Sequence, residues 1–510
     1  MHRFELARIA EAELELLNQI AALKQQYERR RNFNLCRIPA ELLTRSLSFL
    51  PAKDILSIIR VCQLLRAHVI GTPGLWTNVN DIRNPAAFSF VLECTRNLPV
   101  DITRLCVTGP DDALFDILAA HMHHIRTLCL DFSLIASRLE ISSYVRAHKA
   151  FTVTAPLLQR LAMRAQKEPN SGELFPVYYH FLIEASKMPQ LSSLQLHGVQ
   201  LNDNAYGQLQ SLRSFSYSGP ENTPYMGTAV AELVSQRLRN LTTINLELDG
   251  WYVYAGSREL GPAVQRINIH WTRHGLFFPR AAVPPRVAWQ SVRAIHVAHV
   301  HNSSDAPQGA TLVPTMFAIP ETTAPYQTLS VRTSVAPDTR VHVRAIDSEG
   351  RERTFCGIHQ STVVGMVAHI PRHELSAITI TATAVALRAL SDARCPLLSC
   401  IRLVLDTDDI AWINGFARDM PNITTLERLE FSQEAGGAAP KWTTTVIMRT
   451  ISSCIAAGNT LQEVVFLGFS PEPQCTALVG MFSQQVTINQ DWREPKTERV
   501  WFTDLPFEWY

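Results

Sequence analysis

The stretch that most constrains this chain is residues 38–76, IPAELLTRSLSFLPAKDILSIIRVCQLLRAHVIGTPGLW. Its apolar residues recur at steps of three and four, the spacing of an amphipathic helix, in three consecutive runs. Pro51 separates the first run from the second, because proline inside a helix removes a backbone hydrogen bond, and Gly71 ends the third. The spacing predicts three short helices, and a core this small depends on a partner for burial.

Four short markers follow one another along this stretch. They are Ile38-Pro39-Ala40-Glu41-Leu42-Leu43, Leu47-Ser48-Phe49-Leu50, Val61-Cys62 and Leu75-Trp76. In this order they resemble the F-box, the helical unit through which substrate receptors join cullin-type ubiquitin ligases. Leu65 departs from the family, which usually carries Trp at this point of the third helix. The alternative interpretation is an ordinary amphipathic segment in which Leu42 and Leu43 belong to a core.

The resemblance implies an adaptor-binding site in an F-box domain of residues 35–80. Its partners would be the Skp-type adaptor and, through it, the cullin scaffold of an SCF ubiquitin ligase. The residues expected to form the site are Ile38, Pro39, Leu42, Leu43, Leu47, Leu50, Val61, Cys62, Leu75 and Trp76. We expect Leu75 and Trp76 to join this domain to the rest of the chain.

A single helix is predicted over residues 4–31, within an N-terminal domain of residues 1–34. The segment contains neither Gly nor Pro, and it is rich in residues that favour helices. Apolar residues in it follow the spacing of a short coiled coil, which Glu13 interrupts. Weak self-association through residues 4–31 and packing of the helix on its own domain both stay open. A helix followed by an F-box is similar to the arrangement in many large fungal F-box-like proteins.

An apolar hexad, apolar-x-x-apolar-x-apolar, recurs twelve times after residue 76. The hexads start at residues 102, 125, 158, 191, 212, 241, 264, 292, 375, 398, 426 and 461, and apart from one gap the starts lie 21 to 35 residues apart. This period is typical of leucine-rich repeats. The last two apolar residues of a hexad point to the same side of a strand, and the first anchors the preceding turn. The pattern therefore predicts twelve short strands over a shared core.

Helical segments are predicted between these strands. They are Leu114–Met122, Val177–Met188, Ala229–Arg239, Asp408–Met420 and Thr443–Ala457. Strands and helices alternating at this spacing give a parallel sheet with helices on one side. The expected fold class is α/β: an N-terminal helix and a three-helix F-box, followed over residues 81–510 by an irregular leucine-rich-repeat-like solenoid. We expect it to be irregular because Val199, Asp249 and Val300 stand where such repeats commonly carry Asn.

Residues 300–372 interrupt the hexad pattern and form a predicted β-rich insertion. Alternating residues there predict strands at Leu329–Thr333, Arg340–Ala345 and Arg353–Gly357. The insertion is either an elaboration that binds a partner or a bulge in the solenoid. A last edge strand is predicted at Arg499–Thr503.

The residue between the two inward residues of each strand points to the opposite face of the sheet. Neighbouring strands lie about 4.8 Å apart, so these residues should form an exposed polar column that binds a protein substrate. The candidates are Gln195, Asn245, Asn268, His296, Arg402 and Glu430. By the same reasoning, Cys106 and Cys129 are expected to be neighbours in one column.

The composition favours a globular protein inside the cell, in the cytoplasm or the nucleus. Apolar residues make up 46% of the 510 residues, and 47 basic against 46 acidic residues attract neither nucleic acid nor acidic lipid. Ten cysteines are scattered without a Cys-x-x-Cys pair, which is typical of reduced thiols. The sequence predicts no signal peptide and no membrane helix.

The sequence contains no catalytic signature, so we expect a binding protein without cofactor or metal. His373-Glu374 begins a zinc-protease pattern, but Ala377 occupies the place of the second His. Three functions stay open. They are an SCF substrate receptor, a leucine-rich-repeat scaffold without a ubiquitin-ligase role, and an enzyme with an unrecognised pocket.

Overall fold

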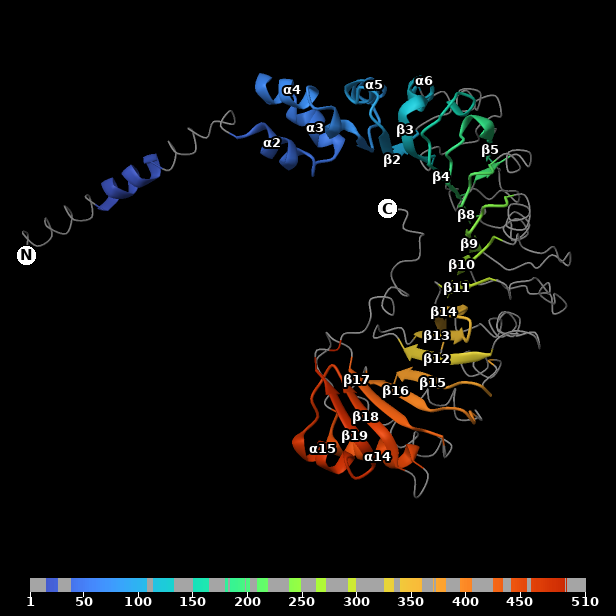
Figure 1. Cartoon of the computed structure of the whole chain (residues 1–510). Coiled ribbons are helices and arrows are strands. Elements are labelled where there is room, and N and C mark those ends of the chain that lie inside the picture. The colour runs from blue at the N-terminus through green and yellow to red at the C-terminus, as the bar shows by residue number, and fades with distance from the viewer. Residues whose placement is uncertain are drawn as a thin grey trace, which may run out of the picture.

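The computed structural model of the chain describes residues 15–25, 38–107, 113–132, 150–164, 179–181, 184–197, 199–201, 209–218, 238–248, 263–271, 292–299, 325–333, 340–359, 370, 373–381, 395–405, 425–433, 442–455, 460–490 and 492. Over these residues the protein is a mixed α/β structure dominated by one open sheet of 17 strands. Figure 1 shows the strands following one another along an arc, with most of the helices gathered at its two ends.

The three helices predicted in residues 38–76 are confirmed, and we call this segment the helical module. They are α2 (Ala40–Leu47), α3 (Ala52–Ile58) and α4 (Gln63–Ile70), and a 3-10 turn η2 (Pro73–Trp76) follows them. Pro39 and Pro51 occupy the N-caps of α2 and α3, where the missing amide breaks no helical hydrogen bond. The Cys62 Sγ caps α4 by accepting a bond from the Leu65 amide at 3.5 Å.

The described part of the predicted N-terminal helix, residues 15–25, is helical. Its apolar side chains Leu16, Leu17, Ile20 and Leu23 are all exposed. The rest of the predicted helix, residues 4–14 and 26–31, lies outside the described residues. No helix in the described ranges is both long and apolar enough to cross a membrane.

All twelve hexads fall on strands, as predicted. The strands are β2 (Val100–Cys106), β3 (Ile125–Asp131), β4 (Arg160–Arg164), β6 (Ser193–His197), β8 (Ser214–Ser218), β9 (Thr243–Leu248), β10 (Arg266–Trp271), β11 (Ala294–His299), β15 (Ala377–Thr381), β16 (Cys400–Leu405), β17 (Arg428–Gln433) and β18 (Leu461–Leu467). Those that neighbour each other pair in parallel, with like hexad positions in register: Leu161 of β4 faces Leu194 of β6, which faces Phe215 of β8. Every apolar hexad position is buried, so one continuous core runs under the sheet.

The first hexad is shifted by a bulge in β2, which the sequence did not reveal. Ile102 pairs with Leu128 and Leu105 with Leu130, so β2 has one extra residue between Ile102 and Leu105. The same shift aligns Cys106 with Asp131 instead of with Cys129. The prediction that these two cysteines share a column is therefore wrong.

Two strands that the sequence did not predict form the edges of the sheet. β1 (Asn78–Asn80) pairs with β2 directly after the helical module, and β19 (Ser483–Asn489) pairs with β18 at the other end. The predicted edge strand at Arg499–Thr503 lies outside the described residues.

The β-rich insertion continues the sheet instead of interrupting it. Its strands are β12 (Tyr326–Thr333), β13 (Arg340–Asp347) and β14 (Glu352–His359), which confirms the three predicted strands. β14 pairs in parallel with β11 and β12 in parallel with β15, whereas β13 runs antiparallel between them. The sheet therefore passes from one parallel half to the other through an antiparallel hairpin.

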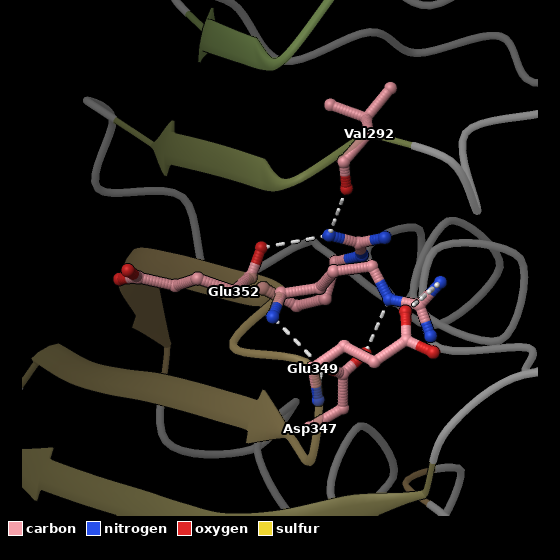
Figure 2. A network of polar contacts seen from close by, with 6 residues as sticks. Val292, Asp347, Glu349 and Glu352 are labelled. Carbon is pink, nitrogen blue, oxygen red and sulfur yellow. Dashed lines mark hydrogen bonds and ion pairs between the residues drawn. The ribbon is translucent and has the colours of Figure 1, made fainter.

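A buried arginine joins the insertion to the first half of the sheet (Figure 2). Arg353 aligns with Ile295 of β11 on the core side, and its Nη1 donates to the carbonyls of Val292 and Glu352 at 2.9 Å each. In the adjacent turn, Asp347 accepts bonds from the amides of Glu349 and Arg351 at 3.0 and 2.8 Å. These bonds satisfy polar groups that would otherwise be costly to bury.

Two of the five predicted inter-strand helices are confirmed. They are α6 (Leu114–His121), continued by the 3-10 turn η3 (Met122–His124), and α14 (Thr444–Cys454), whose N-cap Thr443 accepts a bond from the Val446 amide. Two helices that were not predicted, α5 (Pro85–Cys94) and α15 (Pro473–Val479), begin with proline at their first position.

The predicted helix at Val177–Met188 is wrong. Its described residues form β5 (Tyr179–Phe181), which pairs with β7 (Val199–Leu201), and the turn η5 (Ala185–Lys187). Two aromatic residues in β5 favour a strand, and the pairing outweighs the helical spacing. The predicted helix at Asp408–Met420 lies outside the described residues, as does Ala229–Arg239 apart from its last two residues.

Candidate partner-binding surfaces

The helical module leaves several large apolar side chains exposed. Phe49 is 79% exposed, Val61 67% and Leu42 55%, and Leu50 and Leu64 are exposed to a lesser degree. Residues Leu43 and Leu47 on the opposite side of α2 are buried with Ile55, Leu65 and Val69 in the core of the module. Among the described residues, the module therefore has apolar side chains that form a core and others that stay exposed.

The ten predicted adaptor-binding residues divide between these two sides. Leu43, Leu47, Leu75 and Trp76 are buried, and Ile38 and Cys62 are half-buried. Pro39, Leu42, Leu50 and Val61 are exposed. Only this last group and parts of the half-buried pair are available for contact with another protein while the module keeps this packing.

Trp76 ties the helical module to the sheet. It is fully buried, its Nε1 donates to the Val69 carbonyl at 2.9 Å, and its ring meets that of Phe90 of α5 edge-on at 5.9 Å. Leu75 is buried beside it, and the chain then enters β1 directly. Both residues lie between the module and the sheet.

The six predicted substrate-face residues lie in one column of the sheet. Parallel pairing aligns Gln195 with Ser216, Asn245, Asn268, His296 and Thr354 across strands β6 to β14. In the other parallel half, Thr379 aligns with Arg402 and Glu430. The hairpin connects the halves, because Thr354 pairs with Arg344 and Ser330 pairs with both Arg344 and Thr379.

Several residues of the column are buried, contrary to the expected exposed face. Asn245, Asn268 and Glu430 are each at most 5% exposed, whereas Gln195 and His296 are half-buried. The Asn268 Nδ2 donates to the Asn245 Oδ1 at 2.7 Å, and the Asn245 Nδ2 donates to the Ser216 Oγ at 2.8 Å. Because parallel strands hold like positions about 4.8 Å apart, these amides bond to one another instead of to water or a ligand.

Glu430 is the centre of an ionic network at the far end of the column. Its carboxylate accepts bonds from the Arg402 Nε at 2.5 Å and the Arg428 Nε at 2.7 Å. Arg428 also pairs with Glu463 at 3.0 Å, and the Thr487 hydroxyl donates to Glu463 at 2.6 Å. Two cations and two carboxylates neutralise one another, so this part of the face is polar without excess charge.

His296 lies beside a second ion pair, at the junction with the insertion. The Arg344 Nε lies 2.8 Å from the Glu352 Oε1, and the Thr354 hydroxyl donates to the same carboxylate. Burial alone would raise the pKa of Glu352, but the Arg344 guanidinium lowers it below its ordinary value. Burial lowers the pKa of His296, and the cations Arg266 and Arg344 act in the same direction, so its imidazole is neutral at pH 7.

Three histidines cluster at the end of α6. The rings of His123 and His124 lie 4.5 Å apart and those of His121 and His124 5.2 Å apart. Burial, with the neighbouring imidazoles, lowers the pKa of His124 to about 4 and also lowers that of His121. No cluster in the described ranges has the arrangement of metal ligands, and the buried His124 packs beside Thr95, directly after α5.

Cys356 and Cys400 of the sheet are poor nucleophiles. Burial raises the pKa of the Cys356 thiol to about 12 and that of Cys400 to about 11. A thiol with such a pKa carries almost no thiolate at pH 7, and the thiolate is the reactive form. These cysteines therefore serve packing.

Sequence reasoning missed several residues of these surfaces. Phe49 and Leu64 are exposed in the helical module, and the helical spacing of 38–76 gave no sign of which apolar residues face outward. Ser216, Arg428 and Glu463 complete the polar networks. Their strand positions could have been read from the hexads, because each lies one or two residues from a predicted inward residue.

No family model matches this chain, and no curated protein matches its sequence.

Proposed function

We propose that this chain is the substrate-recognition subunit of an SCF-type E3 ubiquitin ligase. In this proposal residues 38–76 are an F-box that binds the Skp-type adaptor, which links the chain to the cullin scaffold. The strands and the segments between them are an irregular leucine-rich-repeat-like solenoid that holds a protein substrate. The chain contributes proximity inside the cell, and the transfer of ubiquitin is performed by other subunits.

The exposed apolar side of the helical module is the observation that carries this proposal. Burying a fully exposed side chain the size of Leu, Val or Phe contributes about 1.5–3 kcal/mol. Leu42, Val61 and Phe49 are each more than half exposed, so a partner that covered them would gain several such increments. An amphipathic helix that lays its apolar face into a hydrophobic groove of a partner is a common mode of protein recognition.

The arc of strands supports a role in holding a protein. A sheet of 17 strands offers a long face, and its column of polar side chains is held in place by hydrogen bonds between neighbours. A preorganised face loses little entropy on binding. The buried amides set the shape of that face, and the half-buried and exposed side chains beside them are the ones a substrate would touch.

Co-purification with a Skp-type adaptor tests the proposal. The full chain is co-expressed with the adaptor as wild type and as Leu42→Ser/Val61→Ser. A matched control, Leu478→Ser/Met481→Ser, removes two apolar residues of 41% and 73% exposure at α15, far along the chain from the module. We expect the wild type and the control to retain the adaptor and the module variant to lose it. No retention by the wild type, or equal retention by the module variant, would contradict the F-box assignment.

A non-catalytic scaffold without a ubiquitin-ligase role is the second candidate. It is favoured by the burial of Leu43 and Leu47, two expected contact residues, within the module itself. In that case the module caps the sheet and no adaptor is retained, while the chain still binds its protein partner. The same co-purification therefore separates the two functions.

A further inference from the structure

Four arginines stand at the edge of the sheet where its parallel strands begin. Arg160 and Arg266 are the first residues of β4 and β10, and Arg213 and Arg293 directly precede β8 and β11. All four are exposed. We call them the arginine row.

Strand pairing places the arginine row on one line. The register aligns Arg160 with Ser193, Ser214, Thr243 and Arg266 in one column, and Arg213 and Arg293 occupy the column directly before it. From β4 to β11 the sheet advances five strand spacings, which is roughly 24 Å at 4.8 Å per strand. The row is therefore long and narrow.

Across β4 to β11, no described carboxylate lies in the two columns of this row, and Glu352 of β14, which continues the column beyond Ala294, is bound by Arg344. The two columns contain twelve residues across β4, β6, β8, β9, β10 and β11, and none is acidic or aromatic: Gln159, Arg160, Ser192, Ser193, Arg213, Ser214, Thr242, Thr243, Gln265, Arg266, Arg293 and Ala294. In the described part of the chain, the side chains of Arg213, Arg266 and Arg293 make no hydrogen bond or ion pair. Arg160 bonds only to the neutral amide of Gln195, at 3.1 Å.

The other arginines on this face of the sheet are paired. Arg104 pairs with Asp131, Arg126 with Asp101, and Arg344 with Glu352. In the second parallel half, Arg428 occupies the same column as Arg266 and is held by Glu430 and Glu463. Among the described residues of this face, the sheet thus neutralises its arginines elsewhere, and the row offers guanidinium groups that can form bidentate bonds with a carboxylate.

We infer that the arginine row binds an acidic, extended segment of the protein substrate. This inference rests on the proposed function, in which the sheet holds a protein. An extended chain advances about 3.3 Å per residue, so a segment of about seven residues spans the row. Nucleic acid is a poorer match, because the row carries no aromatic side chain for stacking bases and the chain's net charge is only +1.

Binding of a defined peptide to the full chain tests this inference. The probe is a fluorescent peptide of about ten residues that alternates Glu and Ser, and anisotropy is measured at low and moderate salt. The variant Arg213→Gln/Arg266→Gln/Arg293→Gln removes three charges from the row. The control Lys53→Gln/Arg96→Gln/Arg449→Gln removes three exposed positive charges outside the row, so the control and the row variant have the same net charge.

We expect the row variant to bind the peptide about tenfold more weakly than the wild type, and the control to bind it as the wild type does. A peptide with Gln in place of Glu should not bind. The inference is overturned if the row variant binds equally well, if the Gln peptide binds equally, or if single-stranded RNA of the same length binds more tightly and depends on the row. Co-purification of the row variant with the adaptor separates this inference from the proposed function. If the row variant loses the peptide but retains the adaptor, the result supports the arginine-row inference and leaves the F-box proposal intact. If the wild type binds the peptide but not the adaptor, the result contradicts the F-box proposal alone.

Discussion

In the sheet, every apolar position of the twelve hexads is buried, whereas the helical module leaves Leu42, Phe49, Leu50, Val61 and Leu64 exposed. Both regions show regular apolar spacing in the sequence. The difference lies in the neighbours: each strand has the next repeat beside it to cover its apolar residues, whereas the three short helices pack on one another and, through Trp76, on α5 at one side. Regular spacing therefore indicates a core in the sheet and a core plus a contact surface in the module.

The same substitution in the two regions should have very different effects. Phe215 of β8 is fully buried, so Phe215→Ala should lower the free energy of unfolding by about 3–5 kcal/mol. Phe49→Ala removes the same atoms from an exposed site and should change it by no more than about 0.5 kcal/mol. Urea denaturation followed by circular dichroism measures both. Equal losses would mean that Phe49 is covered in the free protein.

The elements with regular apolar spacing were predicted correctly from the sequence, and the irregular ones were not. The hexads located twelve strands correctly because Leu161, Leu194 and Phe215 repeat one local environment, and the three helices of the module followed from apolar spacing and Pro51. The bulge in β2 between Ile102 and Leu105 and the edge strand β19, whose Val486 is only half-buried, leave no such signal.

Burial of polar residues could not be predicted from single positions. Asn245 and Asn268 occupy places that read as solvated, and they are buried because each is the hydrogen-bond partner of its neighbour two dozen residues away. The exposure of Phe49 likewise depends on how three helices pack, which spacing does not specify. Tertiary contacts, and not the local sequence, decide both.

The buried amide column gives an intermediate effect. Asn245→Ala removes the acceptor of the Asn268 amide and the donor to Ser216, leaving buried polar groups without their partners, and should cost about 1–3 kcal/mol. Gln195→Ala, at a half-buried place in the same column, should cost less. Denaturation midpoints of the two variants measure this. A smaller loss for Asn245 than for Gln195 would show that water reaches the column.

The histidine cluster makes stability depend on pH at the end of the sheet next to the module. The folded-state pKa of His124 is about 4, below its ordinary value of 6.5, so the unfolded chain takes up the proton first as the pH falls. Its contribution to stability is complete above about pH 6.5 and is lost progressively toward pH 4. Thermal melting of the wild type and of His124→Gln across this range measures it. The slope should be shallower in the variant, and identical slopes would contradict a buried neutral imidazole.

Amide hydrogen exchange with and without a Skp-type adaptor tests the central claim most directly, because it reads the module and the sheet in one experiment. The substitution Leu42→Ser/Val61→Ser should change the free energy of unfolding by less than about 0.5 kcal/mol at each exposed site, so it serves as a folded control. We predict that the adaptor slows exchange in α2, α3 and α4 of the wild type, leaves β4 to β11 unchanged, and has no effect on the variant. Unchanged exchange in residues 38–76, or protection that falls on the sheet instead, would contradict the assignment of the module as the adaptor-binding part of the chain.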